Sequence, residues 1–295
     1  MPSPESTLKP DEVTLVLVQQ AVTKHRMRYD MVFFKAVLAG LMLSFGALMN
    51  EIVSGGTPAL SEASANPAIP KILGGFVFPS GFVLIPMLGL ELLTSNMMVL
   101  PMGIASGQIP WWSLPINWLI VTFGNLAGSL FSAAVLVHYS DILSSEPFFS
   151  GVQAFASKKA VVPQWHQIFL RGIGCNILVC IAIWVRLGTR IKNDSSLVAI
   201  WIPIWIFVAC SFDHVIANMF YIPLGIMFDT PSLSTANYIR KSLIATYLGN
   251  IVGAFIVWGP AVYFYIWNAD YNNKKLEGTE AGTLKDIEAG YVKDE

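Results

Sequence analysis

Long apolar stretches separated by short polar segments make up most of this chain of 295 residues. An α-helix needs about 20 apolar residues to cross a bilayer core about 30 Å thick. Four stretches of about this length each predict one membrane-spanning helix, at residues 31–50, 118–138, 165–185 and 243–267. Lys35 lies near enough to the start of the first helix for its ammonium group to reach the polar interface.

Two further apolar stretches, 71–110 and 197–229, are too long for one such helix and too short for two joined by a loop. Each contains helix-breaking or polar residues near its middle: Pro79, Gly81, Pro86 and Gly89 in the first, Pro203 and Ser211 in the second. Interrupted stretches of this kind are typical of helices that break near the membrane midplane around a binding site. We therefore predict an all-α membrane protein with six spans, of which the second and the fifth are broken.

Composition supports a membrane protein. Hydrophobic residues make up 54% of the chain and charged residues 13%, about half the usual share for a soluble domain. A net charge of −1 offers no basic surface for nucleic acid, so we expect no such partner. The three cysteines, Cys175, Cys180 and Cys210, lie in apolar runs and are expected to be buried, without a disulfide or a metal site. We expect no cofactor.

The spans divide the chain into five parts. They are a tail (1–30), a first three-span unit (31–138), a loop (139–162), a second three-span unit (163–268) and a tail (269–295). Both polar tails, which we expect to be partly disordered, are predicted to be cytoplasmic because Lys and Arg are more numerous on that side. The loop 139–162 is then extracellular, and the glycosylation sequence at 193–195 faces the cytoplasm, where it is unused.

The two halves of the chain resemble each other in sequence. Glu91-Leu-Leu-Thr-Ser-Asn96-Met97 matches Asp213-His-Val-Ile-Ala-Asn218-Met219, and Gly124-Asn125-x-x-Gly128 matches Gly249-Asn250-x-x-Gly253. Three spans per half is an odd number, so the two copies must enter the membrane from opposite sides and form an inverted repeat. We expect the substrate path between the halves, at the two breaks.

Each repeated residue type favours a role. We expect Glu91 and Asp213 to cap the helices that restart after the breaks by accepting hydrogen bonds from free backbone N–H groups, with proton transfer as the alternative. Asn96 and Asn218 are expected to join the broken segments by side-chain hydrogen bonds, with substrate contact as the alternative. The glycines of the Gly-Asn-x-x-Gly motifs are expected to allow close helix packing.

His214 breaks the repeat, because the equivalent position in the first half is Leu92. A histidine in the middle of a membrane is energetically unfavourable unless it is hydrogen-bonded, so a core imidazole is possible but a functional one is favoured here. The remaining histidines are expected to be solvated or interfacial: His25, His138 and His166.

These motifs resemble the formate/nitrite transporter family over residues 31–267. The matching segments are Ser-Phe-Asp213-His214-Val-Ile-Ala-Asn218-Met-Phe-x-Ile-Pro-x-Gly, Glu91-Leu-Leu-Thr94 and Phe-Gly124-Asn125-Leu-x-Gly128. The resemblance implies an aquaporin-like protomer of six helices in a symmetric homopentamer within the lipid bilayer of the plasma membrane. It also implies transport of small monovalent anions (nitrite, formate, lactate) with protons, and the overall character is closest to fungal nitrite transporters.

The resemblance also implies pore positions. His214 falls on the central histidine and Thr94 on the threonine whose hydroxyl lies near it. The apolar constrictions fall on Phe78, Phe82, Leu93 and Phe207, the pore asparagine on Asn176, and the vestibule lysine on Lys158 or Lys159. Leu93 stands where many bacterial relatives have Phe, and Asp213 stands where they have Glu.

The low dielectric constant of the membrane interior suggests a transport mechanism. A bare anion is unstable at an apolar constriction and its neutral acid is not, so we expect the anion to take a proton near the centre, from His214 or from water. Nitrite is the preferred substrate, with formate or lactate as alternatives. A neutral-solute channel is the rival of another class, but the Asn-Pro-Ala motif of aquaglyceroporins is missing from both breaks. An enzyme would need a convergent cluster of acid–base groups or metal ligands, and the predicted spans contain no such cluster.

Overall fold

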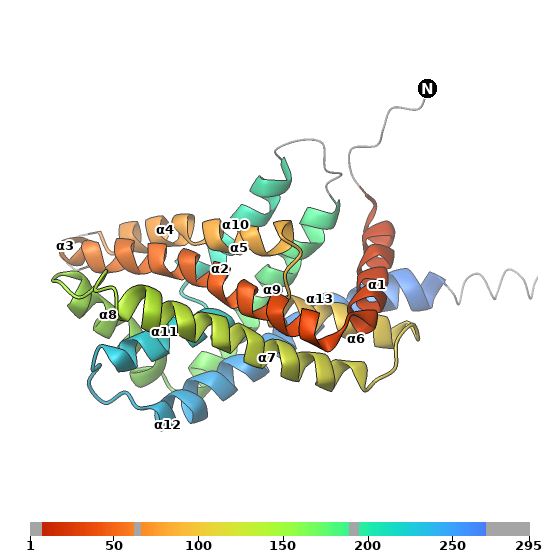
Figure 1. Cartoon of the computed structure of the whole chain (residues 1–295). Helices are drawn as coiled ribbons and strands as arrows, with labels where there is room; N and C mark the ends of the chain where they lie inside the picture. Colours follow the sequence, from red (N-terminus) through yellow and green to blue (C-terminus); the bar gives the residue numbers. More distant parts are fainter. Residues whose placement is uncertain (1–7, 62–65, 189–194, 270–295) are drawn as a thin grey trace, which may run out of the picture.

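The protein is described by a computed structural model over residues 8–61, 66–188 and 195–269. These residues form helices joined by loops (Figure 1). Most of the predicted C-terminal tail and of the glycosylation sequence lie outside the described residues.

Five helical segments are long and apolar enough to cross a membrane, judged by length and composition. Four of them extend beyond the predicted spans, because polar residues at a helix end lower hydropathy without stopping the helix. The segments are α2 (Tyr29–Gly56), α4–α5 (Ala68–Val77 and Pro79–Met87), α7–η1 (Ser113–Phe131 and Ser132–His138), α9 (Trp165–Gly188) and a segment of α12, η3, α13 and η4 (Thr235–Asn237, Tyr238–Leu243, Ile244–Val262 and Tyr263–Trp267).

Both of the over-long apolar stretches are interrupted. In the first, α6 (Leu93–Ala105) follows α5 after five residues, among which Gly89 has a φ of +63°. In the second, α11 (Val215–Met227) follows α10 (Ser195–Ala209), and Ser211 at the matching position has a φ of +61°. The interruptions therefore lie at left-handed residues rather than at Pro79 or Pro203, which remain inside helical segments.

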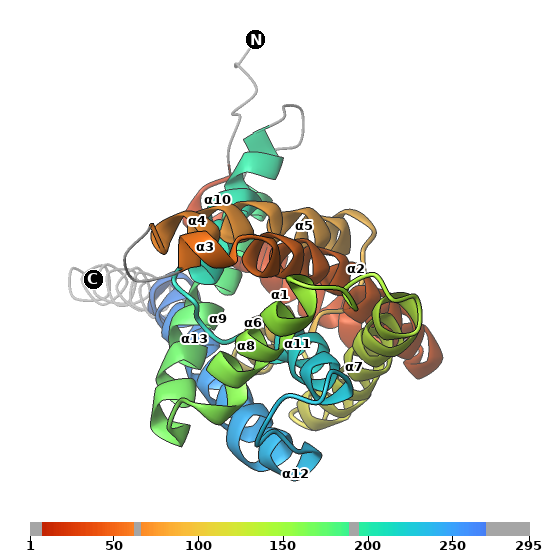
Figure 2. The same cartoon turned by 90° about the vertical axis from the view of Figure 1, so that its left-hand side faces the viewer.

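The two helices that restart after the breaks form the centre of the molecule. Every residue of α11 from Val215 to Gly225 is buried, and so are most residues of α6. The longer helices surround them in the view along the bundle (Figure 2). A polar group on either restarted helix is therefore shielded from the surroundings.

The predicted close packing of the Gly-Asn-x-x-Gly glycines is confirmed. A side chain at Gly128 would meet the backbone of α2 at Val37, and a side chain at Gly249 would meet the backbone of α9 at Phe169. These contacts hold α7 against α2 and α13 against α9, so that each half contains one tightly packed pair.

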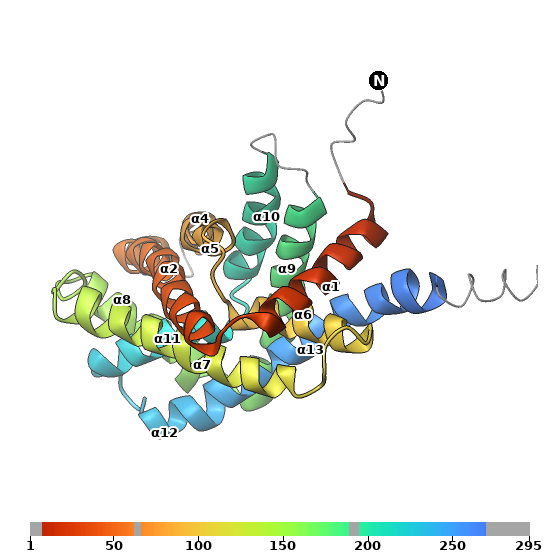
Figure 3. The ribbon, with the colours of Figure 1, turned by 45° about the vertical axis from the view of Figure 1, so that its right-hand side comes forward.

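The N-terminal segment is more ordered than predicted. Residues Pro10–Arg26 form helix α1, which lies across α6 (Figure 3). Its buried residues Val13, Leu17 and Ala21 recur every four positions, as on one face of a helix. That apolar stripe is too narrow to raise the average hydropathy of the segment, so the sequence did not predict this helix.

The predicted loop 139–162 is also largely helical. It contains α8 (Phe148–Ala156) and the π-helical turn η2 (Ser157–Val161), which pack against α2 and α11. A short helix, α3 (Pro58–Ser61), completes the described elements. The helices α1 and α8–η2 thus each cover one restarted helix.

Candidate functional site

His214 and Thr94 meet at the centre, one from each break. The Nε2 atom of His214 lies 2.9 Å from the Thr94 hydroxyl oxygen, and both side chains are buried. The backbone N–H of Ala217 donates to Nδ1 of His214 at 3.1 Å, so Nδ1 carries no proton. The neutral imidazole therefore has its proton on Nε2 and donates it to Thr94. Through this bond the side chain of His214 caps the N-terminus of α11. Leu92, the equivalent residue before α6, makes no such side-chain bond.

The asparagines of the repeated Gly-Asn motifs hold the backbone at the breaks. Asn125 Oδ1 accepts from the N–H of Leu93, and its Nδ2 donates to the carbonyls of Ala36 and Glu91, at 2.8–3.0 Å. Asn250 repeats the pattern in the second half, with the N–H of Val215 and the carbonyls of Gly172 and Asp213. Sequence reasoning gave these asparagines no role, although their duplication in register was the available signal.

The carboxylates Glu91 and Asp213 do not cap the restarted helices. Within the described residues, neither accepts a hydrogen bond from a backbone N–H. Glu91 instead forms an ion pair with Lys24 of α1 at 2.6 Å, and Asp213 forms one with Lys159 of η2 at 3.0 Å. The capping prediction was therefore wrong, because each acid points outward to a lysine while an asparagine takes the free N–H group.

The other two repeated asparagines lie beside these acids. Asn96 Nδ2 donates to Glu91 at 2.8 Å and to Asn117 at 2.8 Å. Asn218 Nδ2 has longer contacts of 3.4–3.5 Å to Asp213, Ser242 and Thr246. Both asparagines thus join a restarted helix to its neighbours.

Lys159 and Lys158 occupy different places. The ammonium group of Lys159 also donates to the carbonyls of Ser211 and Phe212 at the second break, and only 8% of the residue is exposed. Lys158 is exposed on the wall of a cavity. Lys24, which sequence reasoning did not single out, is the counterpart of Lys159 at the first break.

A cavity of about 610 Å³ leads from the molecular surface to His214. Its wall carries four basic side chains: Lys71, Lys158, Lys159 and Arg171. At its inner end the rings of Phe78 and Phe207 meet edge to face at 5.6 Å, and Phe207 stacks on His214 at 5.8 Å. An ion that enters this cavity therefore meets positive charge first and aromatic rings afterwards.

The remaining predicted pore residues are buried around this centre. Phe82 and Leu93 are fully enclosed and do not line the cavity. Asn176 donates to the carbonyls of Asn250 at 2.8 Å and of Thr94 at 3.3 Å. Asn176 thus joins α9 to the backbone of both halves near the His214–Thr94 pair.

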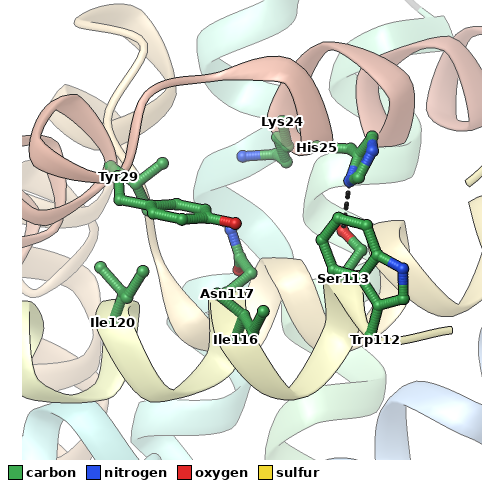
Figure 4. A pocket seen from close by; sticks show the side chains of 9 residues that line it. Lys24, His25, Tyr29, Trp112, Ser113, Ile116, Asn117 and Ile120 are labelled. Atoms are coloured by element: carbon green, nitrogen blue, oxygen red, sulfur yellow. Dashed lines mark hydrogen bonds between the residues drawn. The ribbon is translucent and has the colours of Figure 1, made fainter. Parts of the chain in front are cut away.

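One expectation about exposure was wrong. Cys210 is exposed and lines the cavity, because it follows α10 where the break opens onto that space; Cys175 and Cys180 are buried as predicted. His25 is half-buried: its Nδ1 lies 3.0 Å from the Ser113 hydroxyl and its ring contacts Trp112. It lines a small pocket beside Lys24 between α1 and α7 (Figure 4).

The fold and the site together define a class: a helical membrane protein with a buried polar centre reached through a basic cavity. Residues 11–265 match the formate/nitrite transporter family, and the chain belongs to that family. Family membership makes the protein a multi-pass membrane transporter or channel and not an enzyme.

Individual relatives agree with this assignment. The chain is 33% identical over 260 residues to the "Probable formate transporter" of Methanothermobacter thermautotrophicus, covering 84% of this chain and 92% of that protein. It is 30% identical to the formate channel FocA of Escherichia coli (strain K12), covering 80% of this chain and 86% of that protein. A solved pentameric formate channel with formate bound superimposes with a TM-score of 0.70 at 28% identity, covering 80% of this chain and 96% of that one.

Proposed function

We propose that this protein carries nitrite and similar small monovalent anions across the membrane together with protons, past His214. The observation that carries the proposal is the single imidazole bonded to Thr94 at the inner end of a cavity with four basic side chains. Positive charge raises the local concentration of anions, and the buried His214–Thr94 pair offers hydrogen-bonding groups at the inner end of the cavity, where the anion can be protonated.

The proposed path has three stages. The anion enters the basic cavity, where its charge is compensated. It takes a proton beside the His214–Thr94 pair, from cavity water that is held there by hydrogen bonds, and becomes the neutral acid, while His214 keeps its Nε2 proton. The neutral acid then passes the apolar side chains at much lower cost than the anion, since burying an unpaired charge is the least favourable step.

The proposed architecture is six spans in an inverted 3 + 3 repeat, assembled as a homopentamer in the plasma membrane with both termini cytoplasmic. The matched hydrogen bonds of Asn125 and Asn250 and the matched ion pairs of Glu91 and Asp213 support the repeat. The α10–α11 pair supplies the sixth span. The pentameric formate channel supports the assembly, and the distribution of Lys and Arg supports the orientation.

Formate is the second candidate substrate, because two named relatives and the solved channel are formate proteins. Lactate is a third member of the same chemical class. A channel for neutral solutes is disfavoured, since the four basic side chains around the cavity would not attract an uncharged molecule.

Competition in proteoliposomes tests the proposal. Purified protein is reconstituted, and labelled nitrite uptake is measured against unlabelled nitrite, formate, lactate and glycerol while external pH is recorded. We expect nitrite to compete best, and each transported anion to make the external solution more alkaline. Stronger competition by formate would make formate the substrate, and glycerol flux without a pH change would replace the transporter proposal with a neutral channel.

A further inference from the structure

Glu51 of α2 is a buried acid that the proposed pathway does not use. Only 1% of the residue is exposed, and neither carboxyl oxygen has a hydrogen-bond partner among the described residues. A buried ionised carboxylate without partners is strongly unfavourable, whereas the protonated form is not. The position is thus suited to binding a proton.

Glu51 lies beside the basic cavity. Asn50 and Ser54, its neighbours on α2, line the cavity, and Glu51 is turned by about 100° from Asn50 toward α8. One turn further along, Gly55 packs against α8. The Tyr221 hydroxyl donates to Asn50 Oδ1 at 3.2 Å, and Tyr221 also lines the cavity. Asn50 and Tyr221 therefore line the cavity next to the position of Glu51 on α2.

Among the described residues, the charged neighbours of Glu51 are few. Among the elements packed against α2, the helices α3, α5, α7 and α8 carry no ionisable side chain. The others carry Lys71 (α4), His138 (η1) and Tyr221 (α11), and η2, which continues α8, carries Lys158 and Lys159. Lys159 and Tyr221 interact electrostatically with Glu51.

Lys159 is already paired with Asp213, so its charge does not require Glu51 as an ion-pair partner. When ionised, Glu51 places a negative charge beside the cavity and weakens anion binding there. When protonated, it adds no negative charge beside Lys71, Lys158 and Arg171 of the cavity wall. Anion binding and proton binding at Glu51 must then favour each other by the same factor, since coupling between sites is reciprocal.

We propose that Glu51 is a proton-binding residue of the cavity: a proton from cavity water binds a carboxylate oxygen as an anion enters, giving the neutral carboxylic acid. This inference rests on the proposed transport function and assigns a second proton site to it. The cavity thereby takes up the anion and a proton together, before the His214–Thr94 pair is reached.

Uptake kinetics of the full-length protein in proteoliposomes test the proposal. The KM for nitrite is measured between about pH 5 and pH 8 for the wild type, Glu51→Gln, Glu51→Asp and Glu146→Gln. Glu146 is an exposed acid next to α8 and serves as the matched control. We expect the wild-type KM to rise about fivefold or more with pH. Glu51→Gln should keep the low-pH KM throughout, and the other two variants should follow the wild type.

A measurement independent of transport separates this inference from the proposed function. Infrared difference spectra of the solubilised protein should contain the carbonyl stretch of a protonated carboxylic acid that disappears as pH rises. The band should be missing in Glu51→Gln, and nitrite should move its disappearance to higher pH in the wild type and in Glu51→Asp.

The results that overturn the proposal are distinct from a failure of transport. An unchanged pH dependence of KM in Glu51→Gln, or a band that nitrite does not shift, would refute the role of Glu51. Wild-type liposomes without anion uptake would refute the proposed function, and the infrared titration would still decide whether Glu51 binds a proton coupled to nitrite. If Glu51→Gln does not assemble, the wild-type and Glu51→Asp spectra decide alone.

Discussion

At the scale of single residues, the asymmetry between His214 and Leu92 is the most informative feature. The two positions are equivalent in the repeat, and both precede a restarted helix with extended backbone. The scaffold thus already accommodates an apolar side chain at one of them. A substitution at His214 can therefore remove the imidazole without removing the backbone geometry that holds it.

We predict that His214→Leu assembles normally and loses nearly all proton-coupled uptake of nitrite or formate. His214→Asn should retain some hydrogen bonding to Thr94 without a titratable proton, so its residual flux separates the two roles. Uptake and external alkalinisation are measured together with surface expression. Wild-type rates and pH dependence in His214→Leu would reduce the histidine to a packed polar residue.

Cys210 offers a second test at this scale. Its thiol lines the cavity, whereas Cys175 and Cys180 are fully enclosed. We predict that a negatively charged thiol reagent added to the cavity side attaches to Cys210 alone and reduces anion uptake several-fold, because it adds negative charge in the access path. Mass spectrometry locates the label. Cys210→Ala should be insensitive to the reagent, and equal inhibition of that variant would show that the cavity is not the path.

At the scale of elements, the side chains of Asn125 and Asn250 hold the breaks together. Each makes three hydrogen bonds of 2.8–3.0 Å, which join the first residue of a restarted helix, the residue two positions earlier and a neighbouring long helix. The glycines on either side bring the helices close enough for these bonds to form. The duplicated motif is therefore a unit for fixing a broken helix.

We predict that Asn250→Ala lowers the free energy of unfolding by about 1–3 kcal/mol, because it leaves the buried N–H of Val215 without its partner and removes one hydrogen bond from each of two buried carbonyls. Asn218→Ala should lower the free energy of unfolding by a smaller amount, since the contacts of Asn218 are 3.4–3.5 Å long. Thermal stability of the oligomer in detergent measures both. Asn218→Ala should weaken the oligomer before it changes substrate preference; an Asn218→Ala protein with normal stability and shifted selectivity would contradict its structural role.

At the scale of the whole molecule, charge is distributed in two ways. Buried lysines pair with the acids at the breaks, as Lys24 does with Glu91 and Lys159 with Asp213. Other basic groups remain on the cavity wall, where they act on ions in solution. The first kind stabilises the fold and the second attracts substrate.

This division predicts different effects at two adjacent lysines. Lys158→Ala should raise the apparent KM about two- to tenfold, reduce its dependence on ionic strength and leave Vmax nearly unchanged. Lys159→Ala should also destabilise the protein, by about 3–5 kcal/mol, because Asp213 loses its buried partner. Uptake at several salt concentrations and oligomer melting measure these effects. A Vmax loss without a KM change in Lys158→Ala would contradict its role in attracting anions.

The sequence alone determined the local features. Hydropathy located the long helices and the two interrupted stretches, because membrane insertion depends on the average polarity of about 20 successive residues. Comparison of the halves located the repeated acids, asparagines and glycines, and it identified His214 as the unmatched position. The close packing at Gly128 and Gly249 also followed from the motif.

Only the tertiary structure decided which of these residues meet. The partners Lys24 and Glu91, Lys159 and Asp213, and Asn250 and Val215 are far apart along the chain, and hydropathy contains no information about such pairs. The acids were expected to be caps because capping is a local rule, while the lysines that pair with them come from other helices. The helix α1 and the exposure of Cys210 were not predicted for a similar reason. Whether a residue is buried depends on the segments that pack against it, and these segments belong to distant parts of the chain.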